Sequence, residues 1–125
     1  MATIYVSRNG NSHKLKLRDD KNKNPNNEDL TTGVVPNEIV EWRLEENSGL
    51  SEIIGIKESD PGLSQYKGSQ TLLANGATRD KNGVWTATVV SSSPGKKKFQ
   101  NYMIGYKIPD DDKEYWHDPK LEMKT

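Results

Sequence analysis

The sequence predicts an all-β protein, in which residues 1–125 form a single antiparallel β-sandwich of about seven strands. Three observations lead to this prediction. Apolar and polar residues alternate with a period of two in several segments, as they do in strands that bury one face. Turn pairs such as Asn-Gly and Ser-Gly recur roughly every 8–15 residues, which is typical of sandwiches and barrels. No segment shows the periodicity of an amphipathic helix.

The first element is predicted as a β-hairpin over residues 2–18. Both arms alternate, and Asn9-Gly10 between them suits a tight turn because both residues tolerate a positive φ. His13 has the same parity as Leu15, so it is expected at the boundary of the apolar face. A long polar loop over residues 19–36 follows.

The middle of the chain is predicted to contribute strands at residues 38–44 and 50–57. In the second of these, Ile54 and Ile56 share a parity and are expected to face the core together. Residues 63–83 are compatible with either a short helical turn or a weak edge strand, because their few apolar residues are scattered.

The last third of the chain is predicted to form strands at residues 84–90, 99–108 and 120–124. The first of these is rich in β-branched and aromatic residues, which favour strands. The alternation predicts the following core: Ile4, Leu15, Leu17, Val40, Trp42, Leu44, Ile54, Ile56, Trp85, Tyr102, Ile104, Tyr106, Ile108 and Leu121.

The composition excludes several classes of chemistry. The chain has no Cys, which removes disulfides, iron–sulfur clusters and thiol catalysis. Eighteen Lys and Arg balance 18 Asp and Glu, so the net charge of zero argues against a nucleic-acid partner. The longest apolar runs are short, so no membrane partner is expected. The first residues lack the features of a signal peptide, and the cytoplasm is the expected location.

The order of the predicted strands resembles the plan of cupredoxin-like and immunoglobulin-like β-sandwich modules. The resemblance lies in a strand that contains Trp42, a strand that contains Trp85, the run from Tyr102 to Tyr106, and the closing segment 118–121. It implies an immunoglobulin-like or cupredoxin-like topology. Blue-copper cupredoxins hold their metal with two His, a Cys and often a Met, and this chain lacks the Cys, so no copper or other cofactor is expected.

Calcium is considered because acidic residues gather in two loops. Asp20, Asn22 and Asn24 have the spacing of an EF-hand loop, but Pro25 and Thr31 occupy the positions that require Gly and Glu. The second loop carries weak calcium candidates at alternating positions, namely Asp110, Asp112, Glu114 and Asp118. The alternative for both loops is that Asn and Asp simply favour turns.

Catalysis is not expected, and no catalytic residue is assigned. The chain lacks a Gly-x-Ser-x-Gly nucleophile elbow, a phosphate-binding loop and a dinucleotide fingerprint. Only His13 and His117 are available as imidazole bases. The latter lies in a polar stretch between Trp116 and Asp118, where an exposed histidine is the simpler interpretation.

The sequence therefore favours a non-catalytic interaction or self-assembly module that acts through protein–protein contacts, with a protein partner or a further copy of the chain. Exposed strand edges offer one physical route for such contacts. The alternative is a carbohydrate-binding, lectin-like module that uses exposed aromatic residues. The candidate ligand-binding residues are Tyr115, Trp116 and His117, and calcium-binding loops are the lesser alternative.

Overall fold

The computed structural model describes residues 1–21, 23–60 and 62–125. The protein is all-β, with one short 3-10 helix, η1 (Ser64–Tyr66), in the described part. The strands are β1 (Ala2–Arg8), β2 (Leu15–Asp19), β3 (Thr31–Val34), β4 (Ile39–Leu44), β5 (Glu52–Glu58), β6 (Leu73–Arg79), β7 (Trp85–Val89), β8 (Phe99–Lys107), β9 (Tyr115–His117) and β10 (Lys120–Met123).

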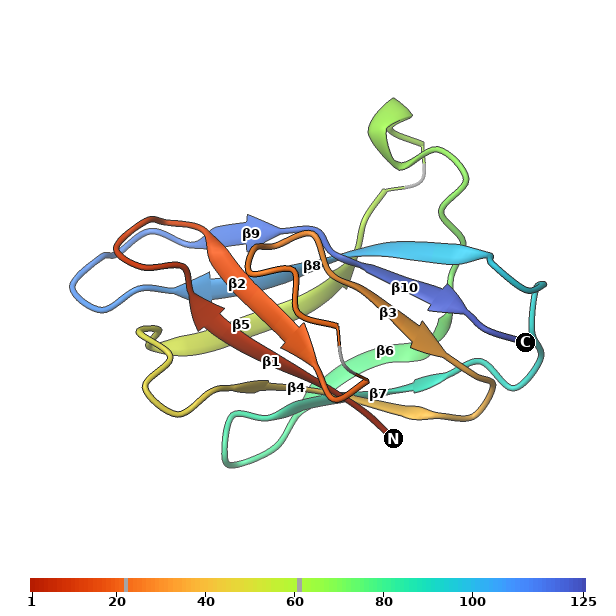
Figure 1. Cartoon of the computed structure of the whole chain (residues 1–125), viewed down its shortest axis with the longest axis horizontal. Coiled ribbons are helices and arrows are strands. Elements are labelled where there is room, and N and C mark those ends of the chain that lie inside the picture. The colour runs from red at the N-terminus through yellow and green to blue at the C-terminus, as the bar shows by residue number, and fades with distance from the viewer. Residues whose placement is uncertain (22, 61) are drawn as a thin grey trace.

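The strands form two sheets. The first sheet has the order β2-β1-β4-β7-β6, and the second has the order β3-β10-β8-β5, in which β9 also pairs with β8. Figure 1 shows β8, β9 and β10 in one layer, with β1, β4 and β7 in the other. β9 and β10 follow the same side of β8 one after the other, β10 along residues 99–101 and β9 along residues 104–106.

The prediction of seven antiparallel strands is wrong in two respects. Ten strands form in the described residues, and both sheets are mixed, because β1 pairs in parallel with β4 and β10 pairs in parallel with β3. The three additional strands are β3, β6 and β9, and none of them has a clear alternating pattern in the sequence. β3 has four residues and lies inside the predicted loop 19–36, and β9 has only three residues. The third additional strand, β6, contains Asn75-Gly76, an Asn-Gly pair of the kind expected at turns, which here forms a bulge within the strand.

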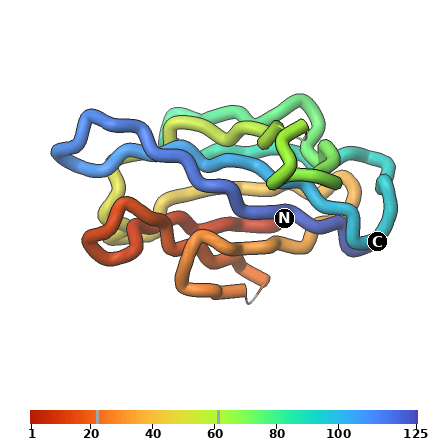
Figure 2. The backbone as a smooth tube through the Cα atoms, turned by 90° about the horizontal axis from the view of Figure 1, so that it is seen from above, coloured from red at the N-terminus to blue at the C-terminus, as the bar shows by residue number. Residues whose placement is uncertain are grey.

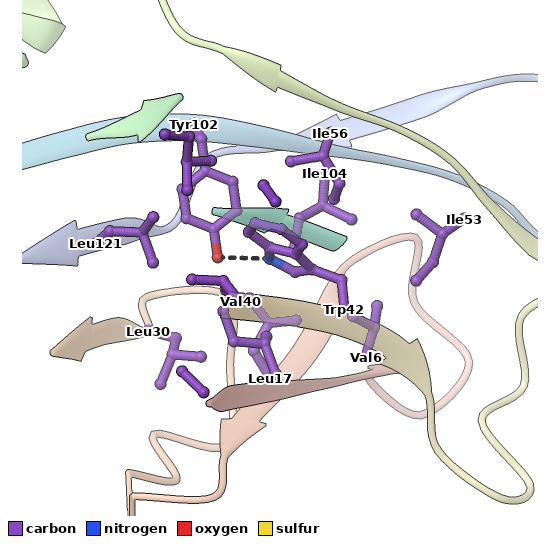
Figure 3. Close-up of a cluster of buried hydrophobic side chains, with 14 of the residues drawn as sticks. Val6, Leu17, Leu30, Val40, Trp42, Ile53, Ile56, Tyr102, Ile104 and Leu121 are labelled. Carbon is purple, nitrogen blue, oxygen red and sulfur yellow. Dashed lines mark hydrogen bonds between the residues drawn. The ribbon is translucent and has the colours of Figure 1, made fainter. Parts of the chain in front are cut away.

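The core lies between the sheets, and most of the predicted core residues are confirmed. Trp42 of the first sheet and Tyr102 of the second are both fully buried. Their polar atoms meet, because the indole Nε1 of Trp42 donates a hydrogen bond of 3.1 Å to the hydroxyl of Tyr102 (Figure 3). This contact joins the layers and satisfies a donor that burial would otherwise leave without a partner. Leu44 and Trp85 pack against the core from partly buried positions.

Two predictions from parity are wrong. Ile53 is buried in place of Ile54, because the register of β5 against β8 shifts between Ile53 and Gly55. Such a bulge moves the residues on one side of it to the opposite face. His13 lies outside β2, in the exposed connection between β1 and β2.

The polar segment after β2 has a structural role. Asp19 is buried, and its Oδ1 accepts hydrogen bonds from the backbone N–H groups of Lys21 and Lys23. Its Oδ2 accepts one from the hydroxyl of Thr32 on β3. A single carboxylate therefore connects the edge of the first sheet to the edge of the second. In the part of the chain that the structure describes, no helix is long and apolar enough to cross a membrane.

Candidate functional site

The three candidate ligand-binding residues form β9, and its alternation separates them. β9 pairs antiparallel with β8, so that Trp116 lies beside Gly105 while Tyr115 lies beside Tyr106. Residues that lie directly opposite each other on paired strands point to the same face of the sheet. Trp116 therefore shares the outer face of the second sheet with Gly105. Tyr115 and His117 belong to the opposite face. The predicted trio is therefore two separate features.

Trp116 lies flat on the outer face of the second sheet. A Cβ atom built on Gly105 would stand 2.5, 2.6 and 2.7 Å from Cη2, Cζ3 and Cζ2 of the indole. Nearly equal distances to three neighbouring ring atoms mean that the face of the ring, and not its edge, covers the glycine. A Cβ on Gly55 would stand 3.0 Å from the same Cη2. The indole thus extends from β9 across β8 to β5.

The two glycines explain how the ring can lie so close to the backbone. Gly55 and Gly105 are paired with each other in the β5–β8 register, so they form one continuous strip without side chains. A glycine inside a strand often marks a site where another group approaches the backbone closely. Both glycines are visible in the sequence, but alternation alone does not connect them with Trp116.

Lys57 is the charged neighbour of this ring. It lies two residues after Gly55 on β5, and its Nζ is 4.6 Å from the centroid of the Trp116 ring. An exposed cation–π contact of this kind contributes about 0.5–1 kcal/mol. Among the described residues, no carboxylate forms an ion pair with Lys57. We call the surface formed by Gly55, Lys57, Gly105 and Trp116 the Trp116 platform.

Tyr115 and His117 belong to an aromatic cluster around Tyr106. The ring of Tyr106 stacks on Tyr115 at 5.9 Å and on His117 at 5.8 Å, while His13 approaches Tyr115 at 4.9 Å. The hydroxyl of Tyr106 donates to the backbone oxygen of His13. These contacts attach the β1–β2 connection to the second sheet, which is a structural task.

A hydrogen bond also connects this cluster to the β8–β9 loop. The hydroxyl of Tyr115 donates to Oδ2 of Asp111 at 2.7 Å. The backbone N–H of Lys113 and the hydroxyl of Tyr115 both stabilise the carboxylate, and they lower the pKa of Asp111. The same hydrogen bond raises the pKa of Tyr115.

A protruding segment stands on the same outer face as the Trp116 platform. Residues 62–72, which include η1, rise above the second sheet in Figure 1 and lie in front of it in Figure 2. The nearby carboxylate of Asp118 raises the pKa of Tyr66, so Tyr66 lies close to the β9–β10 junction. A Cβ on Gly68 would stand 3.4 Å from the ring of Phe99. Hydrogen bonds from the backbone N–H of Gln70 to the oxygen of Phe99 and from the backbone N–H of Asn101 to Oγ of Ser69 also attach the segment to β8.

The structure does not bring the calcium candidates together. Within the described ranges, no group of three or more His, Cys, Asp and Glu residues is placed to hold a metal ion. Asp118 is next to Tyr66, and Asp20 accepts a hydrogen bond from the backbone N–H of Thr3. Asn22 lies outside the described residues.

Two basic residues of β2, Lys16 and Arg18, point away from the core, and the second of them is paired. Arg18 lies 3.9 Å from the centroid of the Tyr5 ring and forms an ion pair with Glu45. Tyr5 is half-buried on the outer face of the first sheet, on the opposite side of the molecule from Trp116.

In comparisons with known proteins, no family model matches the chain, and no curated protein sequence matches it.

Proposed function

We propose that this chain is a non-catalytic binding module that meets its partner on the outer face of the second sheet. The observation that carries the proposal is the position of Trp116, whose indole lies flat on a strip of two glycines. A ring supported by backbone is held in one orientation before any partner arrives, and such preorganisation lowers the cost of binding.

The first candidate partner is a protein or a further copy of the chain. Tryptophan is among the residues most enriched at the energetic centres of protein interfaces. A net charge of zero also weakens the repulsion between copies. The contact would use the face of the sheet, because the edge strands are poorly suited to pair with another chain.

The edges of the first sheet are occupied or distorted. On β2, the N–H groups of Leu17 and Asp19 donate to the backbone oxygens of Asn27 and Lys23. On β6, the bulge at Asn75-Gly76 has two consecutive positive φ angles, of 60° and 71°. Covered and bulged edges oppose strand addition.

The edges of the second sheet have similar features. The carbonyl of Ile53 on β5 accepts a hydrogen bond of 3.0 Å from Nε1 of Trp85, next to the β5 bulge. The carbonyl of Gly33 on β3 accepts one of 2.7 Å from Nζ of Lys21. Strand pairing, the route considered from the sequence, would have to break these contacts.

The second candidate is a carbohydrate, and the orientation of the ring favours it. An indole that lies parallel to a sheet presents its other face outward, where the apolar face of a sugar ring can stack. Aromatic contacts of this kind bury apolar area and gain from the charge distribution of the ring. A single supported ring with a charged neighbour suits a small, hydroxyl-rich ligand.

The experiment compares the chain with its Trp116→Ala variant on a glycan array and in sedimentation velocity across a concentration series. Tyr5→Ala, on the outer face of the first sheet, is the matched control. Binding or self-association that is lost in Trp116→Ala but kept in Tyr5→Ala supports the proposal. Equal behaviour of all three proteins contradicts it.

We further propose that the two sheets form a single immunoglobulin-like or cupredoxin-like β-sandwich domain in the cytoplasm. The contact between Trp42 and Tyr102 across the layers supports the sandwich. Calcium-binding loops remain the lesser candidate function. Thermal melts with calcium and with a chelator test that candidate, and equal midpoints contradict it.

A further inference from the structure

We infer that the ligand of the Trp116 platform is an acidic sugar, a hexuronate unit of a glycan. The sugar ring stacks on the indole, and its carboxylate pairs with the ammonium of Lys57. This inference rests on the proposed function, since it names the ligand class of the same surface.

The first step of the argument is the support of the ring. Its inner face covers Gly105 and reaches Gly55, so backbone fills the space beneath it. The ring can therefore bind a flat ligand on its outer face without moving. The selectivity among such ligands then depends on the neighbouring side chains.

The second step is the state of Lys57. Its side chain is exposed, and its Nζ stands 4.6 Å from the centroid of the indole. No carboxylate of the described residues pairs with it. The ammonium of Lys57 therefore lies over the indole, where a sugar ring would stack. Because no ion pair holds it there, a ligand can displace it.

The third step follows from this competition. A neutral sugar that stacks on Trp116 displaces the ammonium of Lys57 and offers only hydroxyl groups in return. A hexuronate displaces it as well, but supplies a carboxylate beside the ring, where the ammonium gains a charged partner. Charge complementarity at Lys57 therefore selects the acidic sugar.

The surroundings favour a sugar over a protein segment. The centre of a protein interface normally contains several apolar side chains. Around Trp116, the outer face of β5 offers Gly55 and Lys57, and that of β8 offers Gly105, Lys107 and the half-buried side chains of Met103 and Phe99. None of the exposed large apolar residues of the described chain lies on β5, β8 or β9: Leu63 belongs to the protruding segment of the same face, and Met1, Val35 and Ile39 lie elsewhere.

The test follows tryptophan fluorescence while the protein is titrated with short oligogalacturonides, and with the same chains after methyl esterification. The ester removes the charge and keeps the sugar rings. Two variants accompany the wild type: Lys57→Gln, and Lys16→Gln as a control that removes one exposed lysine from the first sheet. Polyglutamate serves as an acidic chain without sugar rings.

We expect the wild type to prefer the acid over the ester by up to about fivefold, which is the range of an exposed ion pair. The preference disappears in Lys57→Gln and persists in Lys16→Gln. All binding disappears in Trp116→Ala.

Three results overturn the inference. Equal, Trp116-dependent binding of acid and ester removes the role of the carboxylate, but leaves the proposed function intact. Polyglutamate binding as tightly as the oligogalacturonide shows that the site selects acidic chains and not sugars. If no saccharide binds and Trp116→Ala changes neither the glycan array nor the sedimentation, the inference and the proposed function fail together.

Discussion

The indole Nε1 of Trp42 donates a 3.1 Å hydrogen bond to the hydroxyl of Tyr102, and the two residues belong to different sheets. Their rings also meet edge to face, with centroids 5.4 Å apart. Neither side chain is exposed to solvent. The pair therefore combines apolar burial with a satisfied polar contact, and its removal provides the most direct test of the core.

Trp42→Ala is expected to lower the free energy of unfolding by about 3–5 kcal/mol, because it leaves a large cavity between the sheets. Urea denaturation followed by circular dichroism measures the change. An effect close to zero would place Trp42 outside the core, which would contradict the structure.

Tyr102→Phe keeps the ring and removes only the hydroxyl, so the buried indole N–H of Trp42 loses its acceptor. The expected cost is about 1–3 kcal/mol, the usual penalty for a buried donor without a partner. The same urea titration measures it, with Tyr5→Phe on the half-buried outer face as the control. A cost for Tyr102→Phe no greater than that of the control would argue against the hydrogen bond.

Alkaline pH is expected to destabilise the fold through Tyr102. Burial raises the pKa of Tyr102 above its ordinary value of 10.0, so the folded chain keeps a proton that the unfolded chain releases. The contribution to stability is fully present below about pH 10 and is lost as the pH rises above it.

Free energies of unfolding measured between about pH 8 and pH 11 test this dependence. The decline should be shallower in Tyr102→Phe, which has no proton to lose at this position. It should not vanish, because burial also raises the pKa of Tyr106. An identical slope in the wild type and in Tyr102→Phe would contradict the assignment.

Gly105→Ala is expected to move the indole of Trp116 off the sheet, since the new methyl group would occupy the space of the ring. The expected destabilisation is about 1–3 kcal/mol, which is typical of overpacking. A red shift of the tryptophan emission would report the greater exposure of the ring. Gly33→Ala is the control, because the atoms nearest to its new methyl group belong to the flexible side chain of Lys124.

Asp19→Ala is expected to lower the free energy of unfolding by about 2–3 kcal/mol, because three donors lose a charged acceptor. Chemical denaturation measures the change. Asp112→Ala removes an exposed carboxylate of the β8–β9 loop and should have little effect. Equal effects of the two substitutions would show that Asp19 does not connect the sheets.

The alternation of residues predicted the strands with long, regular patterns. β8 is the best example, since its residues Tyr102, Ile104 and Tyr106 are buried as expected, and so is Ile108 directly after it. The prediction failed where a bulge changed the parity, as at Ile54, or where a strand was too short to show a pattern, as in β9. Alternation is read from adjacent residues of one strand. A bulge depends on the pairing with a partner strand that is distant in the sequence, so alternation cannot predict it.

The candidate site was predicted only in part. Trp116 was proposed because an aromatic residue in a polar stretch is expected to be exposed and able to stack on a sugar, and its ring does lie on the outer face of a sheet. Its neighbours Gly55, Lys57 and Gly105 come from strands that are distant in the sequence, so no spacing could connect them to it. Tyr115 and His117 were grouped with Trp116 by adjacency, although neighbouring residues of a strand point to opposite faces.

The sequence by itself determined that this chain is built from strands and which residues of its regular strands are buried, because a period of two directly encodes one buried face. The tertiary structure decided the partners of those strands, including the parallel pairing of β1 with β4. It also decided that the indole of Trp116 covers two glycines on other strands. Pairing and register depend on contacts between distant parts of the chain, and these form only when the two sheets pack together.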